Sequence, residues 1–392
     1  MLKWDESIMM KCKKCDYKDN IMINALVVVG NNIKYNQPFM EYLERKVCER
    51  VGHLDAVYHL DKNDPDLFLS IEEIIHKSKH IMIATRDAYN LVSKILCTLT
   101  KDNMLVKEGV LAPSKASSFT HDSYLLSYHD STINVIKIYE KEVLPTIMIS
   151  PKESTVGFFL VDATSEKEQK LLENIVKVND VSISQTVLIT GLVYIKAYGF
   201  KHEQYDGFIQ ALAFGFPDKV LFGDDLSTII SMRLIESGKH VTCAESCTGG
   251  LIASEIVKNA GVSAIFDGSI VSYADEVKKK ALGVKALTLG THGAVSVQTV
   301  YEMLEGALGL MGADMAIAVS GIAGPTGGSK EKPVGRVFVG AKSKDSEAFV
   351  EKLDLKGDRI YIQKQAMFWG FKLLLLSDKK TFFNFLPKKL DN

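Results

Sequence analysis

The pattern of apolar and polar residues predicts strands alternating with helices over residues 24–150. A run of apolar residues at 23–30 predicts a buried strand, and helical spacing at 37–52 predicts a helix that stops at Gly52. Residues 70–85 run from a helical pattern into a strand, and INVIKIYEKE and PTIMIS continue the strand pattern. This alternation predicts an α/β layered domain with a mainly parallel sheet.

The next stretch, residues 151–223, has a different order of elements. VGFFLVDATSEKEQKLLENIVKV predicts a strand, a turn and a helix, and TVLITGLVYIKAYG predicts a pair of strands. The stretch closes with FIQALAFGFPDKVLFGDD, and we expect a domain boundary near Gly223. This order predicts a small α+β linker domain.

A third domain, also α/β, is predicted at 224–392. Its pattern starts with a helix ending at Gly238, the short strand HVTCAE, the helix GGLIASEIVKNAG and the strand IFDGSIVSYA. A helix with Ser296 as its N-cap follows. ADMAIAVSGIAG then leads from a strand into a Gly-rich loop, and two more strands and a long helix complete the domain.

Composition excludes several classes of protein. The 392 residues are 46% hydrophobic and 24% charged, with a net charge of −1, which is ordinary for a globular protein of two or three domains. Near neutrality gives no general attraction to nucleic acid, and no apolar run reaches the roughly 18 residues of a membrane span. The N-terminal segment does not resemble a signal peptide, so we expect a cytoplasmic protein.

Cysteine usage predicts free thiols and no metal site. Six cysteines are few for this length, and in a reducing compartment they stay unpaired. Cys12 and Cys15 form the only C-x-x-C, and zinc would need two more ligands at a suitable spacing.

The most informative stretch is HVTCAESCTGGLIASEIVKNAG, residues 240–261. Ser246 should lie where a strand passes into a helix that starts near Gly249. Unpaired N–H groups at a helix start favour negative charge, so Ser246 could be a nucleophile whose oxyanion they stabilise. The alternative is an ordinary helix cap.

Two further segments could serve the same chemistry. In SIVSYADEVKKKALGV, Tyr273 ends a strand, and of three consecutive lysines on the next helix at most one or two can face a pocket. A lysine there could act as a base if burial lowers its pKa, and otherwise it belongs to a solvated face. In VSGIAGPTGGSKEKPVG, the glycines after Ser320 could approach a phosphate or form a flexible hairpin, and Arg359 could bind an anion or a surface carboxylate.

Five motifs together resemble the C-terminal domain of the CinA family, over about residues 225–377. They are AESCTGGL, GVSAIFDGSIVSYADEVKKKALGV, HGAVS, SGIAGPTGGSKEKPVG and KGDR…QA, in the family's order and spacing. This resemblance implies a nicotinamide-nucleotide amidohydrolase, which converts nicotinamide mononucleotide (NMN) and water to nicotinate mononucleotide and ammonia.

The resemblance also implies which residues act. Ser246 would attack the carboxamide, while Lys278 and Tyr273 would move the protons, with no metal or cofactor. The family's substrate-binding positions fall on Thr248, Gly249, Ser263, Ser320, Gly321, Gly324 and Arg359. A homodimer is expected by the same resemblance, and the partner is a small nucleotide rather than a membrane or nucleic acid.

The N-terminal half resembles the family's molybdopterin-binding-like domain only loosely. Where the family has VGTEL, this chain has VGNNI at residues 29–33, and where the family has TGGLGPT it has ATRDAY at 84–89. Phosphate-approaching glycines and metal-binding acids are thereby absent. We therefore expect the divalent metal site and the family's ADP-ribose pyrophosphatase activity to be lost or severely weakened.

Two other functions are compatible with these observations. The chain could be a competence-associated scaffold that binds nucleotides without turning them over, or a pyrophosphatase served by the N-terminal domain. The presence of Ser246, Tyr273 and Lys278 favours the amidohydrolase over the scaffold, and the altered N-terminal motifs argue against the pyrophosphatase.

Overall fold

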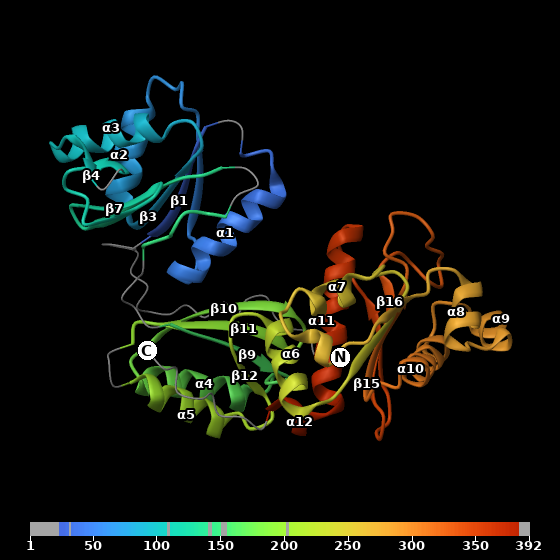
Figure 1. Cartoon of the computed structure of the whole chain (residues 1–392). Coiled ribbons are helices and arrows are strands. Elements are labelled where there is room, and N and C mark those ends of the chain that lie inside the picture. Colours follow the sequence, from blue (N-terminus) through green and yellow to red (C-terminus); the bar gives the residue numbers. More distant parts are fainter. Residues whose placement is uncertain are drawn as a thin grey trace. The chain divides into compact units, whose positions relative to one another are not determined.

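The computed structural model of the chain forms two compact units, Met1–Lys152 and Glu153–Asn392 (Figure 1). The structure describes residues 23–30, 33–107, 110–139, 143–149, 155–200 and 204–383. Cys12 and Cys15 lie outside these ranges.

Unit 1 contains a six-stranded sheet in the order β2-β1-β3-β8-β7-β6. The first four strands are parallel and the last two antiparallel, which confirms the expected α/β class and mainly parallel sheet. The strands are β1 (Ile23–Val29), β2 (Ala56–Leu60), β3 (Ser78–Thr85), β6 (Ser118–Thr120), β7 (Ser123–Tyr128) and β8 (Ser131–Lys137), and β4 (Met104–Lys107) pairs with β5 (Val110–Pro113) separately.

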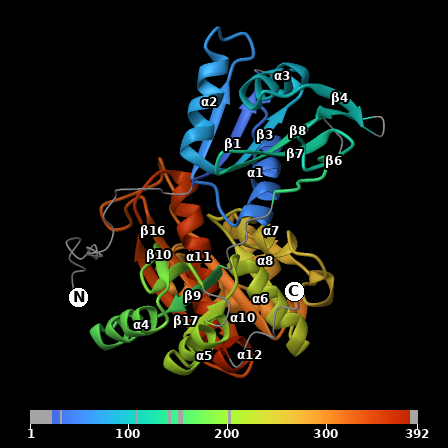
Figure 2. The same cartoon turned by 90° about the vertical axis from the view of Figure 1, so that its left-hand side faces the viewer.

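Helices cover both faces of this sheet (Figures 1 and 2) because its strands are apolar on both sides. Leu26 and Val28 of β1 pack with α1, whereas Val27 and Val29 pack with α2 and α3. Central parallel strands are buried in this way when crossover helices lie on both faces. The helices are α1 (Gln37–Val51), α2 (Leu67–Lys77) and α3 (Tyr89–Thr100).

The expected strand at PTIMIS is wrong. Residues 143–149 form neither helix nor strand. The side chain of Asn134 accepts hydrogen bonds from the N–H groups of Met148 (2.6 Å) and Ile149 (3.3 Å). A side chain has thus taken the place of a strand partner, which the apolar pattern could not reveal.

Unit 2 contains two sheets, of which the first is antiparallel in the order β10-β11-β9-β12. Its helices α4 and α5 pack on one face, and the other face joins a core shared with the rest of the unit. The elements are β9 (Val156–Val161), α4 (Glu166–Val178), β10 (Ser182–Ile189), β11 (Leu192–Tyr198), α5 (Tyr205–Gly215) and β12 (Val220–Phe222).

The second sheet of unit 2 has the order β14-β13-β15-β16-β17. β14, β13 and β15 are parallel, and β16 and β17 are antiparallel. Its strands are β13 (Val241–Glu245), β14 (Ser269–Val271), β15 (Met315–Gly321), β16 (Arg336–Ser343) and β17 (Phe349–Asp354).

Helices pack on both faces of this second sheet. One face shares its core with α6, α7 and α11, and the other with α8 and α10. The helices are α6 (Leu226–Ser237), α7 (Leu251–Val257), the 3₁₀ helix η1 (Val262–Ala264), α8 (Asp275–Leu282), α9 (Ala286–His292), α10 (Val297–Met311), α11 (Arg359–Ser377) and α12 (Lys379–Phe383).

Several local expectations are confirmed here. Ser296 accepts a hydrogen bond from Thr299 N–H at the start of α10, and Gly238 ends α6 in the left-handed conformation. The strand expected at 265–274 is shorter, only Ser269–Val271, so Tyr273 lies two residues beyond it. Among the described helices, none combines the length and apolar character needed to cross a membrane.

Candidate active site

Ser246 lies in the turn between β13 and α7, at the carboxyl edge of the parallel strands. Its N–H donates to Val319 O (2.9 Å) on β15, which extends the β13–β15 pairing by one residue and places Ser246 beside Ser320. Ser246 is 8% exposed. In open α/β sheets, ligands bind at this edge of the strands.

The expected role of the helix N-terminus is wrong in one respect. Helix α7 starts at Leu251 with Gly250 as its N-cap, close to the expected start, but its first N–H groups are occupied. The carboxylate of Glu245 accepts hydrogen bonds from Gly250 N (3.0 Å), Ile252 N (3.1 Å) and Ala253 N (2.9 Å). These N–H groups therefore do not serve an oxyanion on Ser246.

Two consecutive glycines allow the turn to reverse. Gly249 and Gly250 have φ values of +63° and +99°, a region that residues with a Cβ rarely adopt. A Cβ at Gly249 would meet open space, whereas one at Gly250 would contact Val271. Backbone conformation thus explains both glycines, and Gly249 also leaves room above the turn.

Lys278 lies against Ser246 from helix α8. Its Nζ is 3.2 Å from Ser246 Oγ and donates to the carbonyl oxygens of Ser272 (2.7 Å) and Tyr273 (3.2 Å). A neutral amine can make both carbonyl contacts with its two N–H groups and present its lone pair to the serine hydroxyl. This geometry suits a serine activated by a lysine base.

Burial favours the neutral form of this amine. Lys278 is 1% exposed, and its desolvation lowers the pKa of the amine below the ordinary lysine value. Asp275, whose carboxylate is 3.9 Å away, partly opposes this lowering of the pKa, as does Cys247. The next lysine, Lys279, is ion-paired with Glu276 and faces outward, so the expectation that few of the three lysines face inward is confirmed.

Cys247 follows the serine but is unsuited to be the nucleophile. It is buried in the apolar core, and burial raises the pKa of its thiol to about 12. The thiolate is the reactive form of cysteine, so this side chain stays inert at neutral pH. Its carbonyl oxygen accepts a hydrogen bond from Gln363 Nε2 (2.7 Å) on α11, which ties the turn to that helix.

Tyr273 and Arg359 meet beside the serine turn. The guanidinium of Arg359 donates to Gly324 O (2.7 Å), and its second nitrogen is 3.4 Å from the Tyr273 hydroxyl. Tyr273 is 64% exposed, and its main-chain carbonyl, not its phenol, contacts Lys278. The structure therefore joins Tyr273, Gly324 and Arg359 in one group and Ser246 and Lys278 in another.

Three more expected substrate contacts lie at the same edge. Ser320 is buried and donates to Ala294 O (2.7 Å), so its hydroxyl proton is already engaged. Thr248 is buried, and its hydroxyl has no hydrogen-bond partner. At Gly321 a Cβ would come within 2.8 Å of Val337 on β16, so strand packing explains that glycine.

Ser263 lies apart from the other expected substrate-binding residues. It is exposed in η1, close to Ile265, whose carbonyl accepts a hydrogen bond from Val241 N–H at the first residue of β13. Ser246 follows the last residue of that strand, so the two serines lie at opposite ends of it. Sequence matching placed Ser263 in the pocket because it reports residue identity and not position along the sheet.

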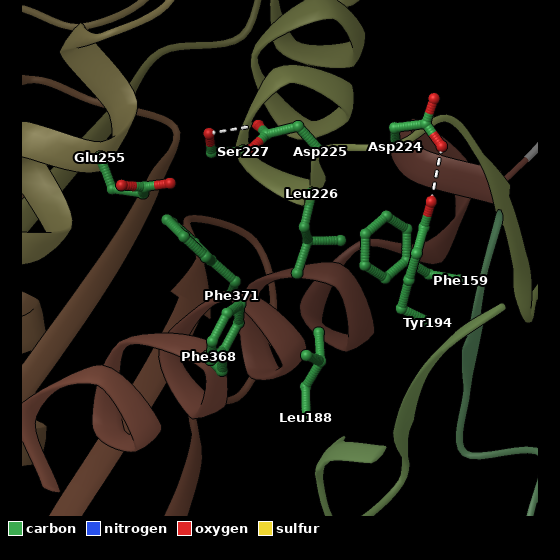
Figure 3. A pocket seen from close by; sticks show the side chains of 10 residues that line it. All are labelled: Phe159, Leu188, Tyr194, Asp224, Asp225, Leu226, Ser227, Glu255, Phe368 and Phe371. Carbon is green, nitrogen blue, oxygen red and sulfur yellow. Dashed lines mark hydrogen bonds between the residues drawn. The ribbon is translucent and has the colours of Figure 1, made fainter. Parts of the chain in front are cut away.

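Ser246 lines neither of two cavities found in unit 2. One cavity, of about 200 Å³, is lined mainly by apolar side chains, which include Leu188 of β10 and Phe368 and Phe371 of α11 (Figure 3). Its acidic rim is already bonded, since Asp224 accepts from Tyr194 and Asp225 from Ser227 (Figure 3). The second, of about 330 Å³, lies at the start of α10.

The corresponding edge of unit 1 is organised differently. Ala88 N–H donates to Thr85 Oγ1 (3.0 Å) after β3, and Asp87 forms an ion pair with Lys62. A Cβ at Gly30 would come within 2.9 Å of the Asp87 carboxylate. Within the described residues, no three His, Cys, Asp or Glu side chains come together as metal ligands.

Sequence reasoning missed three residues that hold the site together. They are Glu245, which binds the start of α7; Ser272, whose carbonyl binds Lys278; and Gln363, which binds Cys247 O. Only Glu245 carried a signal in the sequence, as an acidic residue just before a predicted helix start. The other two act through contacts between segments distant in sequence.

Comparison with known proteins places the C-terminal part of the chain in a family. Residues 223–377 match the model of the CinA C-terminal domain. The nicotinamide-nucleotide amidohydrolase PncC of Enterobacter agglomerans is 48% identical over 151 residues, which are 38% of this chain and 92% of that protein.

Other relatives are matched over different shares of their own length. A CinA-like protein of Thermosipho melanesiensis is 37% identical over 209 residues, 53% of this chain and 51% of that one. The competence/damage inducible protein CihA of Agrobacterium tumefaciens, a crystal structure, is 39% identical over 40% of this chain and 98% of its own, with a TM-score of 0.38. The sequence matches show that this chain belongs to the CinA family.

Proposed function

We propose that the C-terminal part of this chain hydrolyses the carboxamide of NMN to nicotinate mononucleotide and ammonia, as a step of pyridine nucleotide salvage. The observation that carries the proposal is the 3.2 Å contact between Ser246 Oγ and the buried amine of Lys278. The similarity to a nicotinamide-nucleotide amidohydrolase supports the choice of substrate.

In the first step, neutral Lys278 takes the proton of Ser246 as Oγ attacks the carboxamide carbon. The tetrahedral intermediate then collapses, the C–N bond breaks, and the proton passes from Lys278 to the leaving nitrogen to give ammonia. An ester between Ser246 and the nicotinoyl group remains. Covalent catalysis of this kind divides a difficult amide hydrolysis into two easier steps.

In the second step, Lys278 takes a proton from water as that water attacks the ester. The ester bond breaks, the proton returns to Ser246, and nicotinate mononucleotide leaves. Each proton that Lys278 takes is given back, so the amine is neutral again at the end of the cycle. We propose that this cycle runs without a metal or cofactor.

The group next to the serine would bind the rest of the substrate. Arg359 can contact an anionic part of the nucleotide, and the phenol of Tyr273, beside that guanidinium, can donate a proton near the reacting centre. The free hydroxyl of Thr248 and the open space over Gly249 suit a ligand above the turn. Ser320 and Gly321 would shape the wall rather than donate to substrate.

An ammonia assay tests the proposal. Purified protein incubated with NMN should release ammonia, and Ser246→Ala should abolish this release because no nucleophile remains. Ser254→Ala is the matched control, since Ser254 is an exposed serine on α7 and should retain wild-type turnover. If wild-type protein releases no ammonia, a nucleotide-binding scaffold without turnover becomes the better account.

For the N-terminal part, we propose that pyrophosphatase activity and its divalent metal site are lost. The ion pair between Asp87 and Lys62 supports this, because it occupies a carboxylate at the edge where a metal would be needed. ADP-ribose incubated with Mg²⁺ or Mn²⁺ should yield no AMP. Rapid release of AMP would restore the pyrophosphatase as a function of this chain.

The assembly and location of the protein stay predictions. We propose a homodimer in the cytoplasm, with a role for the N-terminal part in dimer formation or in positioning the C-terminal part. Sedimentation of the full chain measures the first of these directly.

A further inference from the structure

Glu245 is a fully buried carboxylate, with 0% of its surface exposed, directly before the serine. Its two oxygens accept three main-chain N–H groups: Oε2 binds those of Gly250 and Ile252, and Oε1 binds that of Ala253. In the part of the chain that the structure describes, no ion pair joins Glu245 to a cation. A buried charge without a counter-ion depends on its hydrogen bonds, so these three bonds hold the side chain in one position.

Those bonds close a loop around the nucleophile. The side chain of Glu245 reaches forward to Gly250, Ile252 and Ala253, so Ser246 and the three residues after it lie inside a ring that these hydrogen bonds close. Positive φ values at Gly249 and Gly250 let the chain turn back far enough for the N–H groups to converge on the carboxylate.

The main chain of the same residue supports the amine. Glu245 O accepts a hydrogen bond from Ser272 N (2.7 Å), and Ser272 O in turn accepts one from Lys278 Nζ (2.7 Å). One residue therefore connects both halves of the pair: its side chain holds the turn of Ser246, and its carbonyl holds the segment that binds Lys278.

We propose that Glu245 is a positioning residue that sets Ser246 Oγ against Lys278 Nζ. This inference rests on the proposed amidohydrolase function. The carboxylate also lies at the positive end of α7 and binds the N–H groups there. Those N–H groups are therefore not available to bind an oxyanion. A displacement of about 1 Å in reacting groups can reduce the rate by roughly a hundredfold.

The test compares Glu245→Gln with Glu255→Gln, which removes a carboxylate from the same helix region but only breaks a surface ion pair with Lys258. In Glu245→Gln the amide NH₂ opposes an N–H group, so at least one bond is lost. We expect kcat for NMN to fall by about 10- to 100-fold with KM changed less than about 3-fold. Glu255→Gln should keep both constants.

Hydrogen exchange separates this inference from the proposed function. The amides of Gly250, Ile252 and Ala253, which Glu245 binds, should exchange faster in Glu245→Gln than in the wild type, whether or not NMN is turned over. If the wild type releases no ammonia, the proposed function fails, but hydrogen exchange still measures whether Glu245 holds these N–H groups. Folded Glu245→Gln with wild-type kcat, or with unchanged exchange at these three amides, overturns the inference.

Glu245→Asp provides a second variant should the glutamine protein not fold. Aspartate keeps the charge but is one methylene shorter, so it cannot reach all three N–H groups. The same kcat and exchange measurements apply, and a wild-type kcat in folded Glu245→Asp contradicts a positioning role.

Discussion

Each unit has a strand-to-helix turn at the carboxyl edge of its parallel strands, and each turn has a carboxylate. The surroundings of the two carboxylates differ. In unit 1, Asp87 follows β3 and its carboxylate is neutralised by Lys62 in an ion pair open to solvent. In unit 2, the carboxylate of Glu245 is buried and bound only by N–H groups of the next helix. The same topology thus carries a surface ion pair in one unit and, in the other, a buried carboxylate beside the contact between Ser246 and Lys278.

The two lysines show what this difference means for chemistry. The side chain of Lys62 is 37% exposed and forms an ion pair with the carboxylate of Asp87. Lys278 is 1% exposed and contacts two carbonyl oxygens and a hydroxyl, while the nearest carboxylate is 3.9 Å away. Burial without a directly bonded carboxylate is what makes an amine available as a base.

The largest effect should come from removing the buried amine. Lys278→Ala should lower kcat for NMN by about 10²- to 10⁴-fold, the usual contribution of a general base, as measured by ammonia release. Lys279→Ala is the matched control, since that side chain pairs with Glu276 and should retain activity within about twofold of wild type. Equal losses in the two variants would mean that the base is assigned wrongly.

A smaller effect should follow from changing the charge near that amine. Asp275 raises the pKa of Lys278, so Asp275→Asn should lower it further and leave more neutral amine at a given pH. The acid limb of the kcat/KM profile for NMN should therefore move to lower pH, with roughly two- to fivefold more activity below the midpoint. The shift is limited because Asp275 is largely exposed and screened.

Asp275→Glu, which retains the charge, is the control for this shift. Its acid limb should stay close to that of the wild type. A midpoint that moves to higher pH in Asp275→Asn would contradict the assignment of Lys278 as the group that must be neutral.

The smallest effect is expected at the ion pair of unit 1. Lys62→Ala should lower the free energy of unfolding by at most about 1 kcal/mol, measured by urea denaturation, because exposed ion pairs contribute little. Ammonia release should not change. A loss of activity comparable with that of Lys278→Ala would remove the distinction between the two turns.

The helices and strands were largely predictable because their patterns are local. The strand at Ile23–Val29 and the helix at Gln37–Val51 follow from apolar runs and helical spacing, and the N-cap at Ser296 from its residue type. Residues 143–149 were not predictable, because the side chain of Asn134, 14 and 15 residues away, binds the N–H groups of Met148 and Ile149.

Within the site, sequence reasoning identified Ser246 and Lys278 but not what supports them. Motif matching placed Ser263 beside them, although it lies at the other end of β13. The position of Ser246 before a predicted helix suggested that N–H groups at the helix start could stabilise an oxyanion, whereas Glu245 binds those of Gly250 and Ala253. Both errors concern which groups reach each other in space.

The sequence by itself determined the residue types, their order along the chain and the alternation of strands and helices, because these depend on neighbouring side chains. The family resemblance pointed to Lys278 among three consecutive lysines, but only the tertiary structure shows that its side chain is buried and contacts Ser246. That burial depends on how α8 packs over the carboxyl edge of β13. Desolvation is a property of the packed surroundings, so no local pattern contains it.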